Sequence, residues 1–111
     1  MKNVYICAPL GGDIEGNLKN ALRYTRFALE QGVAPVTPHF YAECLDDNNP
    51  AERKIGRTAG LSLLLFCDEM WVFGETISAG MRAEIEQCKA LNIRIRHIKE
   101  QQINFVLGGY Q

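Results

Sequence analysis

The sequence alternates between short runs rich in β-branched and aromatic residues and longer stretches whose apolar residues recur at helical spacing. The short runs predict strands at 3–8, 33–37, 69–73 and 93–98, and the longer stretches predict helices at 15–31, 51–66 and 78–91. The tail after Lys99 fits one helical turn and a last short strand at 103–107. Strand–helix–strand repetition gives parallel strands covered by helices. We therefore expect an α/β three-layer sandwich whose parallel, flavodoxin-like or Rossmann-like sheet has four to five strands, with the first strand central.

The length and composition of the chain limit the number of domains and the kinds of partner that it can bind. The 111 residues suit one domain, so we expect 1–111 to form a single unit. The 12 Lys+Arg and 13 Asp+Glu residues leave a net charge of −1, which argues against a nucleic acid polymer as partner but not against a single small anion. No stretch has the pattern of a membrane span or a signal peptide. The four cysteines lack zinc spacing, so we expect reduced thiols in a cytoplasmic protein without a metal or cofactor.

The loop after the first predicted strand is a candidate binding site, because ligands of parallel sheets bind beyond the carboxyl ends of the strands. It contains Pro9, Gly11, Gly12 and Asp13. The two glycines leave backbone N–H groups open to a phosphate or a carboxylate, although a plain tight turn would explain the same residues. His39 follows the second strand at the same edge of the sheet and is a further candidate, with a structural histidine as the alternative.

The loop before the third predicted helix carries a stronger signal. Ser78 is a candidate N-cap, and Gly80 would let a ligand approach the first helical turn. On a helical wheel, Glu84 falls in the apolar sector, which is formed by Met81, Ile85, Cys88 and Leu91. A carboxylate on a buried face is costly unless something binds it. Glu84 is therefore either paired with an arginine from elsewhere in the fold or a ligand-facing carboxylate.

The arrangement Ser78-x-Gly80-x-x-x-Glu84, placed after a strand that Asp68 precedes, resembles the nucleoside 2-deoxyribosyltransferase-like superfamily. That superfamily includes the deoxynucleoside 5′-monophosphate N-glycosidases. The opening YICAPLGGD, the segment PHF and the segment CDEMWVFG are similar to those of its smaller members from bacteria and phages. The resemblance covers residues 3–98.

This resemblance implies a protein that processes small nucleosides or nucleotides, by cleaving the N-glycosidic bond or by transferring the (deoxy)ribose. Glu84 would be the carboxylate nucleophile that attacks C1′ of the sugar. Ser78 and Gly80 would bind the 5′ end or its phosphate. The remaining substrate-binding candidates, which border the sugar or lie at the same edge, are Pro9, Gly11, Gly12, Asp13 and His39.

One position departs from the family. Gly60 lies eight residues before Asp68, where the enzymes usually have an aspartate that helps the base to leave or positions the sugar. Asp46 or Asp47 from the preceding loop could substitute for it. A second hypothesis is therefore a non-catalytic nucleotide-binding module on the same fold, which senses or sequesters its ligand.

Other residues are weaker candidates. Arg53, Lys54 and Arg57 form a basic stretch on the second helix, and Arg57 is the one we expect to meet a phosphate. Tyr5 and Trp71 lie within predicted strands, and core packing is the expected role of both. The second helix carries apolar residues on more than one face, and the resembled enzymes are typically oligomers. Both points predict a homo-oligomer, specifically a dimer.

Overall fold

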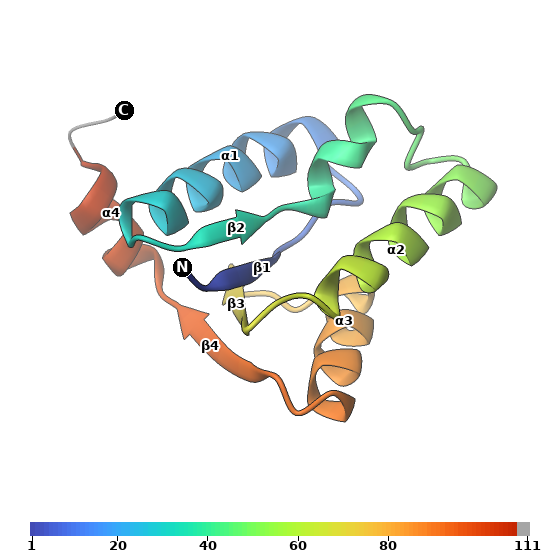
Figure 1. The fold of residues 1–111 in the computed structure, drawn as a ribbon. Helices are drawn as coiled ribbons and strands as arrows, with labels where there is room; N and C mark the ends of the chain where they lie inside the picture. Colours follow the sequence, from blue (N-terminus) through green and yellow to red (C-terminus); the bar gives the residue numbers. More distant parts are fainter. Residues whose placement is uncertain (109–111) are drawn as a thin grey trace.

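The sheet of this protein, seen in a computed structural model that describes residues 1–108, has four parallel strands (Figure 1). Their bounds are β1 (Asn3–Cys7), β2 (Ala34–Val36), β3 (Glu69–Phe73) and β4 (Arg94–Ile98). The order β2-β1-β3-β4 places β1 and β3 in the centre, which confirms the flavodoxin-like prediction and the central first strand. The carboxyl ends of all four strands therefore meet at one edge of the sheet.

Helices cover both faces of this sheet (Figure 1), and their bounds are α1 (Ile14–Glu30), α2 (Pro50–Leu64), α3 (Ala79–Ala90) and α4 (Glu100–Leu107). Successive side chains of a strand point to opposite faces. One face of the sheet packs against α1 and α4 through Ile6, Phe73, Tyr24, Phe27 and Ile103. The other face packs against α2 and α3 through Tyr5, Met70, Leu64, Met81 and Cys88. These two cores give the expected three-layer sandwich.

The structure corrects the prediction for the tail. The expected strand at 103–107 is wrong, because α4 is helical throughout. Ile103 and Leu107 lie four residues apart and are both buried, whereas Phe105 between them is 92% exposed. That spacing is helical. The apolar run was too short for the sequence to distinguish the period of a helix from that of a strand. Within residues 1–108 the sheet has four strands, and none of the helices has the length and apolar character needed to span a bilayer.

Short polar caps fix where the site-forming helices begin. Ser78 Oγ accepts a hydrogen bond from the Met81 N–H at 3.2 Å, which confirms Ser78 as the N-cap of α3. Asn49 caps α2 in the same way. The loop before α2 contains a short 3-10 helix, η1 (Pro38–Glu43), where the sequence indicated only a loop from residue 39 onward.

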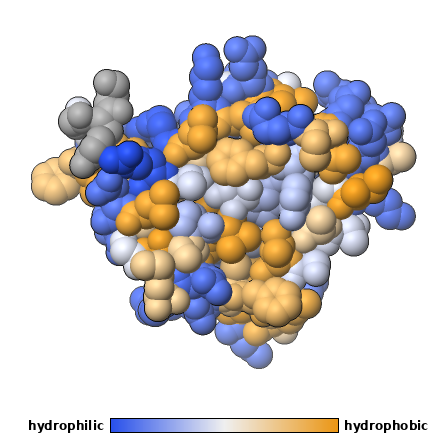
Figure 2. Space-filling model, turned by 45° about the horizontal axis from the view of Figure 1, so that its top comes forward, coloured by the Kyte–Doolittle hydropathy of each residue, from blue (hydrophilic) through white to orange (hydrophobic). Residues whose placement is uncertain are grey.

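Several large apolar side chains in and just after α2 are exposed, which is compatible with the predicted dimer. Ile55, Leu65 and Phe66 are between 58% and 71% exposed, and Figure 2 shows apolar patches among hydrophilic residues on the face that it presents. We expect light scattering at micromolar concentration to give twice the 12.5 kDa mass of one chain. Phe66→Ser should weaken that association. A 12.5 kDa particle for the unmodified chain would contradict the dimer.

Candidate functional site

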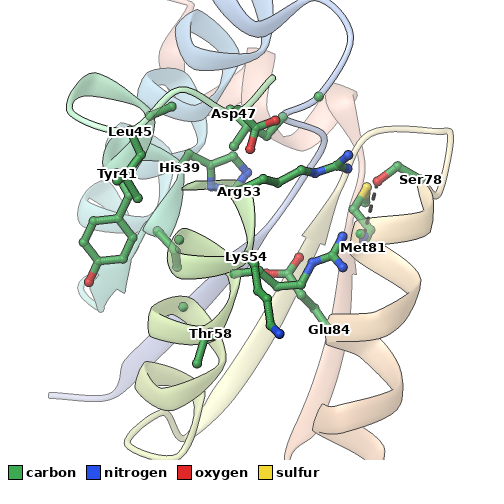
Figure 3. Close-up of a pocket in the computed structure, with 18 of the residues that line it drawn as sticks. His39, Tyr41, Leu45, Asp47, Arg53, Lys54, Thr58, Ser78, Met81 and Glu84 are labelled. Carbon is green, nitrogen blue, oxygen red and sulfur yellow. Dashed lines mark hydrogen bonds between the residues drawn. The ribbon is translucent and has the colours of Figure 1, made fainter. Parts of the chain in front are cut away.

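A cavity of about 770 Å³ opens at the carboxyl edge of the sheet (Figure 3). Its walls come from the loop after β1, η1, the loop that follows η1, α2 and the start of α3. Cavities of this size typically hold a small organic ligand. The sequence prediction that the loop after β1 and the loop before α3 border one site agrees with this placement.

Most of the predicted site residues line this cavity. They are Gly11, Gly12, His39, Ser78, Gly80 and Glu84. Pro9 and Asp13 lie outside its lining. Pro9 stands beside Gly74, whose Cβ position is 3.6 Å from the proline ring. Asp13 is the N-cap of α1, where its Oδ1 accepts a hydrogen bond from the Gly16 N–H at 3.1 Å. The structure thus gives Asp13 a capping role. A role of Pro9 or Asp13 in ligand binding stays a prediction.

The Glu84 side chain projects from the second turn of α3 toward the centre of the sheet. Its carboxylate accepts a hydrogen bond from the hydroxyl of Tyr5 and one from the thiol of Cys7, whose sulfur lies 3.6 Å from Oε1. Throughout residues 1–108, no lysine, arginine or histidine nitrogen lies within 4.0 Å of this carboxylate. Glu84 is therefore not closed off in an arginine pair, and it borders the cavity instead.

The electrostatics of Glu84 place its titration near neutral pH. Burial raises its pKa from 4.5 to about 7, against the hydrogen bonds from Tyr5 and Cys7 and the charge of Arg57, which lower it. Burial and the adjacent carboxylate raise the pKa of the Tyr5 hydroxyl far above its usual range. Tyr5 therefore stays protonated and donates to Glu84, while Glu84 itself can be either an acid or a nucleophilic carboxylate at physiological pH.

Tyr5 is the site residue that the sequence alone did not reveal. It packs in the core as expected and is only 1% exposed, but it lines the cavity and its hydroxyl donates to Glu84. It also explains Gly60, because a Cβ atom on Gly60 would lie 3.1 Å from the Tyr5 hydroxyl and 3.1 Å from Pro38 Cβ. A side chain at position 60 would bring its Cβ atom unusually close to both, so Tyr5 or Pro38 would have to give way slightly. An aspartate at position 60, as is usual in the resembled enzymes, would therefore crowd these two neighbours.

His39 ties η1 to the end of β1. Its Nε2 lies 2.9 Å from the carbonyl oxygen of Ala8, so this nitrogen carries the hydrogen and donates it. Burial lowers the pKa of His39, which keeps the ring neutral. Nδ1 is buried and has no hydrogen-bond partner in the described part of the chain. The Ala8 contact fits the structural alternative, although the ring also borders the cavity.

Comparison with known proteins places this chain in a family. The model of a domain of unknown function, DUF7768, matches residues 2–98. The chain belongs to the DUF7768 family. No curated protein matches it significantly. Among solved structures, the 2-deoxyribosyltransferase from the psychrotolerant bacterium Bacillus psychrosaccharolyticus is similar in fold, with a TM-score of 0.66 and 13% identity. That match covers 94% of this chain and 81% of the other. The expected relationship to the deoxyribosyltransferases is thus shown at the level of the fold.

The acidic residues of the loop before α2 differ in placement in this DUF7768 protein. Asp47 lines the cavity, and Figure 3 shows it above His39 and Arg53. Asp46 does not line the cavity, and its Oδ1 accepts a hydrogen bond from the Asn48 N–H at 2.9 Å. Of the two loop acids considered as substitutes for an aspartate at position 60, only Asp47 is therefore within reach of a ligand. Nowhere in residues 1–108 do three His, Cys, Asp or Glu side chains gather in a way that could hold a metal ion.

Proposed function

We propose that this DUF7768 protein processes small nucleosides or nucleotides, by N-glycosidic bond cleavage or (deoxy)ribosyl transfer through Glu84. The observation that carries the proposal is the Glu84 carboxylate: it lies at the wall of a large cavity, takes a hydrogen bond from Tyr5 and has no cation within 4.0 Å. The fold shared with a 2-deoxyribosyltransferase supports the same chemistry.

In this proposal the reaction has two displacement steps. A carboxylate oxygen of Glu84 attacks C1′ of the sugar, the C1′–N bond breaks, and the base leaves with the electron pair and takes up a proton from solvent. A water oxygen, or a nitrogen of a second base, then attacks C1′ and gives up a proton to solvent, while the ester bond between C1′ and Glu84 breaks and the carboxylate is released. Tyr5 is a positioning residue, because its protonated hydroxyl donates to one carboxylate oxygen and so orients the other for attack.

The first test is direct. The purified chain is incubated with ribo- and deoxyribonucleosides and with their 5′-monophosphates, and free base is measured by chromatography. Base release at a rate proportional to protein concentration would support the enzyme. The departure at Gly60 keeps a second candidate, a non-catalytic module that binds a nucleotide. Calorimetric binding of a nucleotide without any base release would favour that module over the enzyme.

Tyr5→Phe is expected to shift the pH dependence of base release. The rate should rise with pH as Glu84 loses its proton, with a midpoint near 7 in the unmodified chain. Because the Tyr5 hydrogen bond lowers the pKa of Glu84, its loss should move the midpoint to higher pH and reduce the rate at pH 7 by about tenfold. The measurement is the pH profile of kcat from pH 5 to pH 9.

Tyr24→Phe is the matched control for this change. Tyr24 is also buried, but it stacks on Phe73 in the core on the opposite face of the sheet, with ring centroids 4.4 Å apart. Its hydroxyl takes no part in the site, so its removal should leave the midpoint in place. An unchanged midpoint in Tyr5→Phe would show that Tyr5 does not tune the carboxylate.

A further inference from the structure

The two donors that hold the Glu84 carboxylate differ in strength. The hydroxyl of Tyr5 donates to Oε2, and the thiol of Cys7 donates to Oε1 across a sulfur–oxygen distance of 3.6 Å. Both donors reach the carboxylate from β1, because residues two positions apart on a strand point to the same face of the sheet. A thiol is a weak hydrogen-bond donor compared with a phenolic hydroxyl. The lone pairs of Oε1 are therefore less engaged than those of Oε2.

The Cys7 thiol has a second acceptor within reach. Its sulfur lies 3.9 Å from the carbonyl oxygen of Met81, which precedes Glu84 by three residues on α3. A thiol has one hydrogen, and a rotation about the Cβ–Sγ bond can direct it to either acceptor while the sulfur stays in place. If Oε1 forms a covalent bond to another group, the thiol therefore keeps a hydrogen-bond partner.

Cys7 cannot take a more direct part in the chemistry. It is fully buried and does not line the cavity, so it does not touch a ligand. Burial and the nearby Glu84 carboxylate raise the pKa of the Cys7 thiol above its usual range, which keeps the hydrogen on the sulfur. A buried thiol in this state is inert as a nucleophile. What remains for Cys7 is the donation of a weak hydrogen bond.

A buried cysteine is ordinarily a small apolar core residue. The other two buried cysteines fit that description, because the thiols of Cys67 and Cys88 donate to the backbone carbonyls of Leu63 and Ile93, at 3.5 and 3.4 Å. Cys7 differs from them in that one of its acceptors is a carboxylate at the wall of the cavity. This contact, rather than burial, gives Cys7 a role beyond packing.

We infer that Cys7 is a second positioning residue of this site: its thiol holds Oε1 of Glu84, which is the oxygen that attacks C1′, and turns to the Met81 carbonyl once the glycosyl ester has formed. The inference rests on the proposed function and names the oxygen that reacts. A lone pair of Oε1 forms the bond to C1′, the C1′–N bond breaks, and the base leaves with the electron pair and takes up a proton from solvent. Oε2 becomes the ester carbonyl oxygen and keeps the hydrogen bond from Tyr5. The thiol hydrogen stays on the sulfur throughout.

Cys7→Ala removes the donor at Oε1. Because the Cys7 hydrogen bond lowers the pKa of Glu84, its loss should move the midpoint of the pH profile of kcat upward by about 0.5 to 1 pH unit. At pH 9, where Glu84 is mostly ionised in both forms, kcat should still fall by about tenfold, because Oε1 is no longer held in line with C1′. KM at the same pH should stay within about twofold of the unmodified chain, because Cys7 does not touch the ligand.

Cys7→Ser separates positioning from packing. Serine restores a hydrogen-bond donor near Oε1, so the midpoint should return to within about 0.3 pH unit of that of the unmodified chain, and kcat at pH 9 should recover by about threefold or more relative to Cys7→Ala. If Cys7 only packed in the core, serine would be no better than alanine, because it adds a polar hydroxyl to an apolar site.

Cys88→Ala is the matched control. Cys88 is also fully buried and lies one turn beyond Glu84 on α3, but it donates to the Ile93 carbonyl and not to the carboxylate. Its replacement should lower the melting temperature as Cys7→Ala does, and leave the midpoint and kcat unchanged. A kcat at pH 9 that is unchanged in Cys7→Ala, or that serine does not restore, would overturn the inference and leave the proposed function intact.

If no base is released from any substrate, the proposed function fails and the titration of Glu84 decides whether Cys7 positions the carboxylate. NMR on chain labelled with ¹³C at the glutamate carboxyl groups measures this titration, and Glu84→Gln assigns the signal. Tyr5 and Cys7 on β1 and Arg57 on α2 are the groups that act on Glu84, and only Cys7 changes between the forms compared. A pKa that rises in Cys7→Ala and returns in Cys7→Ser, but stays constant in Cys88→Ala, would support Cys7. Equal pKa values in Cys7→Ala and the unmodified chain would refute it.

Discussion

Replacing Glu84 by glutamine is expected to abolish base release while the ligand still binds. An amide cannot form the glycosyl ester, so kcat should fall by about 10³-fold or more. Glutamine has nearly the same shape, and its amide oxygen can still accept the hydrogen bond of Tyr5. Affinity for the substrate should therefore stay within about threefold of the unmodified chain. Single-turnover base release and calorimetry on the same preparation measure the two effects separately.

Glu86→Gln makes the same chemical change on the outer side of the same helix, where the Glu86 side chain is 68% exposed. It should leave base release, affinity and stability unchanged, so it controls for the loss of a negative charge on α3. Full turnover in Glu84→Gln would contradict the nucleophile. If neither form turns over and affinity falls by about 1–3 kcal/mol, Glu84 belongs to a binding module instead. If the melting temperature falls in Glu84→Gln and ligand binding weakens only because the protein is less stable, the carboxylate is structural.

Local patterns in the sequence were sufficient to predict the sheet and the start of α3. The run from Asn3 to Cys7 is β-rich and ends before Pro9, and its side chains divide between the two cores as a period of two requires. Ser78 sits where a cap is expected, and the helical wheel places Glu84 on the inner face of α3. Each of these inferences depends on residues that are close together in the chain.

The contact between Tyr5 and Glu84 could not be inferred in that way, because 79 positions separate the two residues. A tyrosine in a central strand is ordinarily a core residue. Only the way in which α3 packs against β1 brings the Tyr5 hydroxyl to the Glu84 carboxylate. The same holds for Gly60, where the sequence shows a missing acid but not that the Tyr5 hydroxyl and Pro38 lie close to the position of a side chain there. Tertiary packing decides both features.

The loop after β1 shows a different limit of sequence analysis. Its composition correctly indicated a segment at the cavity, but not which members face inward. Gly11 and Gly12 do so, whereas Asp13 is used as a helix cap. Helix capping and anion binding both favour small polar residues and glycine just before a helix, so the sequence cannot separate the two roles.

The raised pKa of Glu84 also predicts a large pH effect on stability. Below pH 4.5 the carboxyl is protonated in both the folded and the unfolded chain. Between 4.5 and about 7 the unfolded chain loses the proton while the folded chain keeps it, so the free energy of unfolding falls as pH rises. Above about pH 7 both are ionised and the loss stays constant. A pKa displaced from 4.5 to about 7 corresponds to about 3 kcal/mol, which is roughly 13 °C in Tm for a domain of this size.

Urea unfolding followed by the fluorescence of Trp71, the single tryptophan of the chain, measures this effect. Other groups also titrate between pH 5 and pH 9, so the informative quantity is the difference in unfolding free energy between Glu84→Gln and the unmodified chain. Because glutamine does not ionise, that difference should grow by about 3 kcal/mol in favour of Glu84→Gln across this range. Glu86→Gln, which removes an exposed carboxylate from the same helix, is the control for the loss of one negative charge. Parallel profiles for Glu84→Gln and the unmodified chain would mean that Glu84 is solvated in the folded protein and ionises without penalty, and a nucleophile tuned by burial would then be excluded.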